Sequence, residues 1–501
     1  MLARLRTAAV FGVDACAVHV EVDVSYGFPS FTMVGLPDTS VRESRDRVRS
    51  AIRNSGFDFP AHRITVNLAP ADVRKAGASF DLPIALGILA AQGVVERRHI
   101  ADLVLLGELS LDGSIHPTRG VLPIAAAARR EGLAGILLPT ANASEAAVVS
   151  GLGVFPVASL ADAVRSLNEP GAETVVPRAV PAAVTPAPPD LADVRGQLLA
   201  RRALEVAAAG AHNLLLIGPP GAGKTMMARR VAGILPPLSF DEALEATAVH
   251  SVAGLLPAGT GLLAHRPFRA PHHTISDAAL VGGGSFPRPG EVSLAHHGVL
   301  FLDELLEFSR HVLEALRQPV EEGHVTIARA ARTVLFPARF MLVGAMNPCP
   351  CGYLGDPTRE CRCTPQQLAR YRDRLSGPLR DRLDLTVEVP AVPPDVLGSM
   401  ASGEPSEAVR ARVVAARERQ RRRYAADASL ANAALTPALI SRHCALDRAG
   451  ARLLSQAVTR MGLSARGYDR VRKVARTIAD LAGADAVSAE HLAEALQFRA
   501  P

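Results

Sequence analysis

The chain has 501 residues, of which 48% are hydrophobic and 4% aromatic, and its formal net charge is +6. This length exceeds that of one ordinary domain, so two or three domains with cores of their own are expected. The mild excess of positive charge permits an anionic partner, but the scarcity of aromatic residues excludes base stacking as the main mode of nucleic-acid binding.

The N-terminal residues do not have the pattern of a signal peptide, because Asp14 interrupts their apolar run and no small-residue cleavage site follows. The longest apolar run, residues 82–95, is too short to cross a bilayer and contains Pro83. Four of the six cysteines crowd into one short loop, which is unlike a disulfide framework. A soluble, cytoplasmic protein is therefore expected.

Residues 1–167 are predicted to form a mixed α/β domain. Alternating apolar and polar residues predict strands at 17–24 and 63–70. Helices are expected at 40–56, 80–93 and 121–132. Residues 168–190 are rich in Pro, Ala and Val without an amphipathic period, which is typical of a semi-rigid linker. The linker separates this domain from a second one, residues 191–392.

The stretch GPPGAGKT lies between a predicted strand, residues 214–217, and a predicted helix. It matches the G-x-x-x-x-G-K-[ST] pattern, whose glycines let backbone N–H groups wrap a phosphate at a helix N-terminus. Lys224 is expected to reach the β and γ phosphates of ATP, and Thr225 to bind Mg²⁺. The alternative is a chance match in a flexible loop. The expected nucleotide-binding residues are Gly218, Pro219, Pro220, Gly221, Ala222, Gly223, Lys224 and Thr225.

Two carboxylates follow the apolar run 299–302, and the carboxyl ends of parallel strands are where open sheets bind ligands. Asp303 is expected to hold Mg²⁺, directly or through water, and Glu304 to polarise the attacking water. An acidic turn after a core strand is the alternative. Asn347 follows a further apolar run and is suited both to orient water near the γ-phosphate and to form a turn before Pro348. Apolar runs that alternate with helices predict an α/β core with a parallel sheet covered on both faces.

Cysteines and histidines in two loops are candidate metal ligands. Cys349, Cys351, Cys361 and Cys363 form two C-x-C pairs across a short loop. Four thiolates suit tetrahedral Zn²⁺, and four reduced thiols are the alternative. His272 and His273, in the loop-like stretch 268–290, are expected to be polar loop residues, with metal binding as the alternative.

Residues 393–501 are predicted to be almost wholly helical. An arginine-rich helix at 407–426 precedes a compact bundle that runs to Phe498. The basic run 417–424 within that first helix is most simply a solvated helix face.

These nucleotide-site elements resemble those of the AAA+ ATPases. Two later segments, residues 376–390 and 463–481, look like the arginine-finger segment and the sensor-2 helix of the magnesium chelatase and MCM branch. The resemblance implies that Arg382 is the finger and Arg466 the sensor, each neutralising phosphate charge in the transition state. A surface ion pair is the alternative for either arginine. The rivals of Arg466 in the same helix are Arg470 and Arg472.

A longer resemblance covers nearly the whole chain. It is to the ComM/YifB-type Mg-chelatase-like ATPases, bacterial proteins linked to branch migration of DNA during transformation. The segments that carry it are residues 266–284, 288–308, 316–329 and 347–363. It implies an AAA+ core with a C-terminal helical lid, assembled as a hexameric ring that uses ATP and Mg²⁺ to thread or remodel branched or single-stranded DNA. Two other functions stay open, namely the motor subunit of a metal chelatase and a non-motor ATP switch or protease.

Residues 325–338 are expected to form two short strands around a turn that carries Arg329 and Arg332. In this ATPase branch a hairpin at this place points into the pore of the ring. Two arginines at its tip would meet DNA phosphates without reading sequence. A solvent-exposed hairpin whose charges only maintain solubility is the alternative.

Residues 68–91 and 106–139 resemble the Lon protease domain. The resemblance implies a Lon-like (ribosomal S5 domain 2-like) α+β fold and places Ser79 at the position of the Lon nucleophile. Lon activates that serine with a lysine, but the corresponding position here is about Leu122, and Lys75 lies off the pattern. We therefore expect no peptidase activity, and a role as a collar, a DNA-binding surface or a ring-assembly element.

Overall fold

The structure is a computed structural model that describes residues 1–71, 75, 77–96, 100–169, 188–284, 287–328, 333–356, 359–392, 402–425 and 430–499. By its internal contacts the chain divides into two compact units. The first contains Met1–Val184, Phe240–Ala264 and Ala328–Phe336, and the second contains Thr185–Ser239, His265–Ile327 and Pro337–Pro501. Within the described ranges, no helix has both the length and the apolar character needed to span a membrane.

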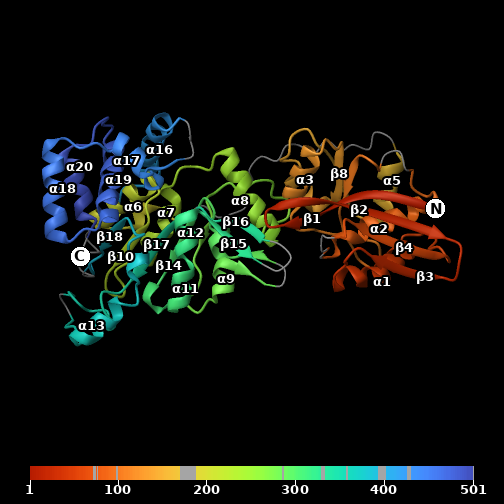
Figure 1. Ribbon diagram of the computed structural model, residues 1–501, viewed down its shortest axis with the longest axis horizontal. Coiled ribbons are helices and arrows are strands. Elements are labelled where there is room, and N and C mark those ends of the chain that lie inside the picture. The colour runs from red at the N-terminus through yellow and green to blue at the C-terminus, as the bar shows by residue number, and fades with distance from the viewer. Residues whose placement is uncertain are drawn as a thin grey trace. The chain divides into compact units, whose positions relative to one another are not determined.

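The first unit is built on a sheet with the strand order β3-β4-β2-β1-β5-β8-β9 (Figure 1). Its central strands β1, β2 and β4 pair antiparallel, whereas the outer neighbours pair parallel. The strands are β1 (Leu2–Phe11), β2 (Asp14–Ser25), β3 (Ser30–Val34), β4 (Arg63–Ala69), β5 (Leu103–Leu105), β8 (Gly135–Pro139) and β9 (Gly153–Val157). A small separate pair is formed by β6 (Glu108–Leu109) and β7 (Ile115–His116). The expected mixed α/β character is therefore confirmed.

Helices cover both faces of this sheet, because buried apolar residues form one cluster with α1, α2 and α5 and another with α3 and α4 (Figure 1). These helices are α1 (Thr39–Asn54), α2 (Asp81–Gln92), α3 (Val121–Arg130), α4 (Ala143–Ala146) and α5 (Leu160–Asn168). Asp38 caps α1 by accepting a hydrogen bond from the backbone of Val41 at 2.8 Å. Helix α2 is buried around its whole circumference, as its uninterrupted apolar sequence predicts.

Helix α8 (Phe240–Ala253) also belongs to the first unit, although the sequence analysis places residues 240–264 in the ATPase core. Its Ser251 hydroxyl donates a hydrogen bond to the buried carboxylate of Glu145. The same carboxylate accepts from the backbone N–H of Leu122 at 2.8 Å, and burial raises the pKa of Glu145. A buried carboxylate needs such partners, so the grouping of α8 follows from tertiary contacts that sequence distance does not reveal.

The second unit contains a parallel sheet with the strand order β11-β14-β17-β10-β18, which confirms the parallel sheet expected for the core. Its strands are β10 (Leu214–Ile217), β11 (Phe268–Arg269), β14 (Val299–Leu302), β17 (Met341–Met346) and β18 (Leu385–Glu388). The central β10, β14 and β17 are short and apolar and are almost fully buried. Their carboxyl ends lie at one edge of the sheet, so the residues that follow them are brought together.

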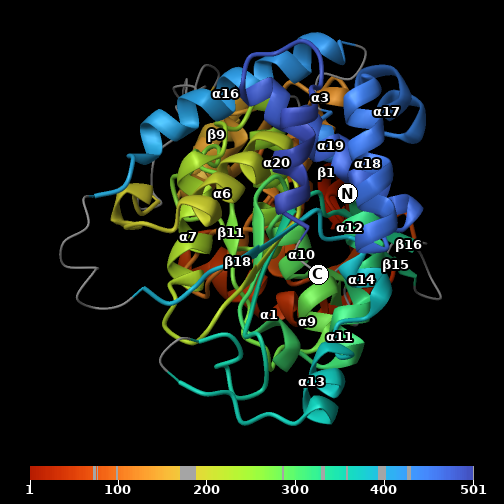
Figure 2. The same cartoon turned by 90° about the vertical axis from the view of Figure 1, so that its left-hand side faces the viewer.

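Helices of the second unit form one core with the sheet. Those around it are α6 (Leu198–Gly210), α7 (Lys224–Ile234), α9 (Asp277–Val281), α10 (Glu291–Leu294), α11 (Arg310–Ala315), α12 (Arg317–Glu322), α13 (Pro365–Arg372) and α14 (Gly377–Arg380). The C-terminal helices are α16 (Ser406–Arg423), α17 (Pro437–His443), α18 (Arg448–Met461), α19 (Ala465–Leu481) and α20 (Ala489–Gln497). Figure 2 shows α16 and α19 beside α6, and their apolar residues share one core with α6, α7 and the sheet.

Two short strands, β15 (His324–Ala328) and β16 (Thr333–Pro337), pair where the sequence predicts a hairpin. Its turn, which carries Arg329 and Arg332, lies outside the described residues. The stretch 268–290, expected to be loop-like, instead contains the short elements β11, α9, β12 (Gly282–Gly283) and β13 (Arg288–Pro289). Ser276 caps α9 by accepting from the backbone N–H of Ala279 at 3.2 Å, which explains the helical turn.

Candidate functional site

The phosphate loop joins β10 to α7 and depends on its glycines. A Cβ atom at Gly218 would lie 2.1 Å from the carbonyl oxygen of Val389 on the neighbouring chain segment, so only glycine fits there. Gly221 and Gly223 have φ angles of +81° and +88°, which side chains rarely adopt. Helix α7 begins directly after Gly223, so its N-terminal N–H groups face the loop. This cradle of backbone donors fits a phosphate group.

The Lys224 side chain is buried inside this loop. Its Nζ atom donates hydrogen bonds to the carbonyl oxygens of Gly218 at 2.7 Å and Pro219 at 2.9 Å, and to Oδ1 of Asn347 at 3.1 Å. Burial lowers the pKa of Lys224, and the negative charges of Asp303 and Glu304 act in the opposite direction. The ammonium group is therefore held between the loop and the end of β17.

The next residue, Thr225, contacts the end of β14. Its Oγ1 atom donates a hydrogen bond to Oδ2 of Asp303 at 2.6 Å. A hydroxyl and a carboxylate oxygen at this separation form the kind of oxygen donor set that Mg²⁺ prefers. The two residues expected to bind Mg²⁺ are thus adjacent in space, although 78 positions separate them in the sequence.

Glu304 is exposed and has a φ angle of +51°, in the left-handed region that is unusual for a residue other than glycine. Its backbone N–H donates to Oδ1 of Asp303 at 3.0 Å. Its side-chain Oε2 atom lies 3.5 Å from Nδ1 of His273. His273 is therefore a residue of the site whose proximity the sequence analysis missed, and no spacing rule links it to Glu304.

Asn347 lies just past β17, as expected, and is half-buried. Besides accepting from Lys224, it interacts through its backbone with the hydroxyl of Tyr371 in α13. Burial, followed by the charge of Glu307, raises the pKa of Tyr371 to about 12, and the hydrogen bond from Asn347 opposes this rise. Nothing in the sequence pattern singles out Tyr371, because its contact with Asn347 is tertiary.

Arg382 is held by groups of the second unit. Its Nη1 atom donates to the carbonyl oxygen of Pro378 at 2.7 Å, and its Nη2 atom forms an ion pair with Glu321 of α12. The Arg382 side chain is 11% exposed, whereas that of Glu321 is 57% exposed. No contact given by the described residues joins Arg382 to Lys224. The ion pair that the sequence analysis gives as the alternative is thus present.

Arg466, at the start of α19, is exposed, and no hydrogen bond or ion pair engages it among the residues that the structure describes. Its two rivals have internal partners. Arg470 lies 3.4 Å from a carboxylate oxygen of Asp384, and Arg472 donates to the carbonyl oxygens of Cys444 and Ile440. Burial lowers the pKa of Arg470, and repulsion from Arg466 and Arg382 adds to this effect. Arg382 and Arg466 therefore both lie near Arg470.

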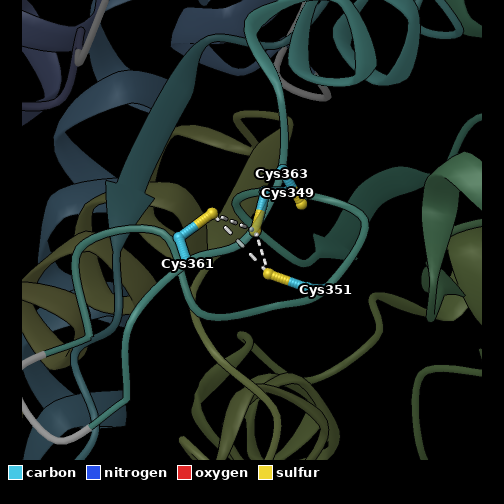
Figure 3. Close-up of side chains that lie close together, drawn as sticks. All are labelled: Cys349, Cys351, Cys361 and Cys363. Atoms are coloured by element: carbon cyan, nitrogen blue, oxygen red, sulfur yellow. Dashed lines mark hydrogen bonds between the residues drawn. The ribbon is translucent and has the colours of Figure 1, made fainter.

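The four cysteines of the loop after β17 gather at one place (Figure 3). Their Sγ atoms all lie within 4.8 Å of one another, and all four thiols are free. A backbone hydrogen bond from Tyr353, followed by the hydrogen bond with Cys349, lowers the pKa of the Cys351 thiol to about 6.

In the first unit, Ser79 is half-buried in a short 3-10 turn (Ala78–Phe80), and Leu122 is buried at the start of α3. Lys75 is fully buried, and its Nζ atom donates to the carbonyl oxygen of Pro70. The position expected to carry the lysine base thus holds an apolar side chain in the core.

Comparisons with known proteins place this geometry in a family. Models of the magnesium chelatase subunit ChlI match residues 20–142 and residues 190–397, and a model of the C-terminal part of that subunit matches residues 403–499. These matches span the parts of the chain that carry both units.

Two relatives cover the whole chain. The uncharacterized protein YifB of Salmonella typhimurium is 48% identical over 509 residues, which cover 100% of this chain and 97% of the relative. The Competence protein ComM of Haemophilus influenzae is 47% identical over 509 residues, with the same coverage. The resemblance to Lon is partial, because the Lon protease of Mycolicibacterium smegmatis is 26% identical over 176 residues, 33% of this chain and 22% of that protein.

Proposed function

Because the chain belongs to the magnesium chelatase subunit ChlI family, together with its full-length relatives YifB and ComM, we propose that it is an ATP-hydrolysing AAA+ motor that remodels DNA. The observation that carries the proposal is the meeting of Lys224, Thr225, Asp303 and Asn347 at the carboxyl edge of the parallel sheet. This arrangement combines a phosphate cradle with oxygen donors for a divalent cation.

In this proposal ATP and Mg²⁺ are the cofactors, and the bound cation would neutralise charge on the phosphates. The backbone of residues 218–225 and the Lys224 ammonium would bind the phosphate oxygens. Thr225 and Asp303 would supply oxygen ligands to the cation. A Zn²⁺ ion at the four cysteines would have a structural role and would not take part in hydrolysis.

Glu304 is suited to accept a proton from the attacking water, because its carboxylate is exposed next to Asp303 and its backbone is fixed in an unusual conformation. His273, 3.5 Å away, would orient that carboxylate. The Asn347 amide would position the same water, as its Oδ1 atom already binds Lys224 at the end of β17. General-base catalysis of this kind contributes about 10²- to 10⁴-fold in rate.

Arg382 and Arg466 would act on a nucleotide bound to a neighbouring subunit. Both lie near Arg470, whereas the described contacts of Lys224 involve neither. An arginine supplied by a neighbour stabilises charge that develops in the transition state. This role requires a closed assembly of identical subunits, for which we propose a hexameric ring.

The DNA part of the proposal rests on the printed name of the competence relative and on the net charge of +6. Arg329 and Arg332 remain the candidate DNA contacts, and the substrate class would be branched or single-stranded DNA of any sequence. The physiological setting would be recombination or natural transformation in the cytoplasm. For residues 1–167, a Lon-like fold without peptidase activity is part of the same proposal, in keeping with the partial similarity to Lon. The domain limits at residues 168–190 and 392–393 are likewise proposed.

The test is the ATPase rate measured without DNA and with single strands, duplex and a four-way junction. We expect single-stranded or branched DNA to raise the rate and branched DNA to be unwound. A rate that no form of DNA changes, together with an absence of unwinding, would refute the DNA motor.

The family models name a chelatase subunit, which supports one other candidate, the motor of a metal chelatase. Insertion of Mg²⁺ into a porphyrin, in the presence of chelatase partner subunits and ATP, would establish that alternative instead.

A further inference from the structure

The loop between β17 and α13 brings four thiols together in a way that the nucleotide site does not require. Cys349 is fully buried, and the other three cysteines are half-buried. The Sγ atom of Cys349 lies 3.3 Å from that of Cys351 and 3.7 Å from that of Cys361. The Sγ atoms of Cys351 and Cys361 are 3.6 Å apart (Figure 3).

These separations agree with the edges of a metal tetrahedron. Zinc binds thiolate sulfur at about 2.3 Å, so two sulfur ligands of a tetrahedral ion lie about 3.8 Å apart. The separations from Cys361 fall within about 0.2 Å of that edge length. Four protein ligands leave no open position, which is typical of a structural zinc site.

The backbone around the cluster already directs donors to the sulfur atoms. The N–H of Leu354 lies 3.3 Å from Sγ of Cys349, and such a hydrogen bond stabilises a thiolate ligand. Gly352 has a φ angle of +86°, which permits the tight turn between Cys351 and Leu354. The turn therefore holds a sulfur-binding conformation at one half of the cluster.

The same loop presses on the phosphate loop. A Cβ atom at Gly352 would lie 2.7 Å from Cδ of Pro220, so the two loops are in direct contact there. Asn347, two residues before Cys349, binds Lys224 through its side chain. The cluster thus lies between two contacts with the nucleotide site, one at Pro220 and one at Lys224.

The other end of the loop is also fixed. Thr364, directly after Cys363, caps α13 in a capping box with Gln367. Helix α13 carries Tyr371, which interacts with the backbone of Asn347. A cross-link at the cysteines would therefore close a circuit that starts and ends at Asn347.

We propose that Cys349, Cys351, Cys361 and Cys363 bind one Zn²⁺ ion, and that this ion braces Asn347 and Pro220 so that zinc occupancy controls the grip on nucleotide. The metal site stands on the thiols alone, whereas its effect on nucleotide rests on the proposed ATPase function.

The first experiment measures zinc in purified full-length protein by elemental analysis, for the wild type, the double variant Cys351→Ser/Cys361→Ser, and Cys16→Ser. Cys16 lies in β2, outside the cluster, and is the matched control. We expect about one Zn²⁺ per chain in the wild type and the control and a loss of zinc in the double variant.

A second reading does not depend on a variant that folds. Wild-type protein whose zinc has been replaced by Co²⁺ should show the visible absorption of a tetrahedral thiolate complex. Wild-type protein that holds neither zinc nor cobalt, or whose cluster thiols are oxidised to disulfides under reducing purification, would overturn the metal site.

The coupling is tested by the affinity for a fluorescent, non-hydrolysable ATP analogue before and after a chelator removes zinc, and after zinc is restored. We expect a severalfold weaker affinity without zinc that returns with it, and a similar loss in Gly352→Ala with zinc still bound. An unchanged affinity would refute the coupling and leave the metal site intact. Zinc-loaded protein that does not bind the analogue at all would instead refute the proposed ATPase function.

Discussion

The Nζ atom of Lys224 lies 3.1 Å from the Oδ1 atom of Asn347, so the phosphate loop and the end of β17 are joined by a hydrogen bond across 123 positions of sequence. The same ammonium group donates to the carbonyl oxygens of Gly218 and Pro219. One positive charge is thus aimed at the phosphate cradle and linked to the residue proposed to orient water.

Replacement of Lys224 by alanine should abolish nucleotide binding, because it removes the only charge that the phosphate loop itself contributes. We expect the dissociation constant for an ATP analogue to rise by at least about tenfold, which corresponds to about 1.4 kcal/mol. Calorimetric titration measures this change, and a thermal melt of the same variant verifies that the fold is kept. Binding as tight as in the wild type would contradict the assignment of the loop.

Glu304→Gln should bind ATP normally but hydrolyse it at least about 10²-fold more slowly, because the amide cannot accept a proton from water. The substitution keeps the shape of the side chain and the backbone hydrogen bond to Asp303. Glu307→Gln is a matched control, since Glu307 is exposed three positions later in the same acidic segment and pairs with Arg374. Equal rates for the two variants would show that Glu304 has no catalytic role.

Arg382→Ala should bind the ATP analogue with unchanged affinity and lose turnover by about 10³-fold, because a finger contacts the nucleotide of the neighbouring subunit. Mixing it with Lys224→Ala should restore part of the ATPase rate, since mixed assemblies contain sites with an intact loop and an intact arginine. Arg380→Ala, which changes an exposed arginine two positions away, should remain active. If the mixture of the two inactive variants gains no activity, the shared site is wrong.

Asp384 should make the second unit less stable in acid. Burial alone would raise the pKa of this carboxyl, but the interaction with His212, the charge of Arg470 and the backbone N–H of Asn213 lower it below its ordinary value. A lowered pKa stabilises the folded state above the pKa of an unfolded Asp, about 3.9, and this contribution is lost as pH falls through the folded value.

The measurement is the midpoint of thermal unfolding as pH decreases from about 6 to about 3. Asp384→Asn should be less stable than the wild type at the upper end of this range, and the difference should shrink towards the lower end. A difference that does not depend on pH would contradict the role of the Asp384 charge.

Ser79 should not act as a nucleophile. Leu122 is buried where the resemblance to Lon expects the lysine base, so nothing at that position can activate the hydroxyl. We expect no cleavage of casein by the wild type or by Ser79→Ala, with or without ATP. Cleavage that Ser79→Ala abolishes would overturn this prediction.

Sequence reasoning was strongest where short-range pattern and sheet geometry agree. The apolar runs of β10, β14 and β17, each followed by a polar residue, predict both the strands and the meeting of Lys224, Asp303 and Asn347. Parallel strands leave their carboxyl ends at one edge, so no knowledge of distant contacts is needed. The four cysteines were also predictable as a group, because they lie within a single loop.

Other features depend on tertiary contacts and could not be predicted. Glu145 and Ser251 lie 106 positions apart, yet their hydrogen bond helps to group α8 with the first unit. The pairing of Arg382 with Glu321 and the approach of His273 to Glu304 likewise follow from packing, which has no periodic signature. The role of Arg329 and Arg332 stays a prediction, because these residues lie outside the described part of the chain.

The central claim is that hydrolysis requires a site completed by a neighbouring subunit. It is tested most directly by the ATPase rate per chain over a dilution series in which mass photometry records the state of assembly. The rate per chain should rise steeply as assemblies form and should be negligible for single chains. Single chains that hydrolyse ATP as fast as assembled ones would contradict the claim.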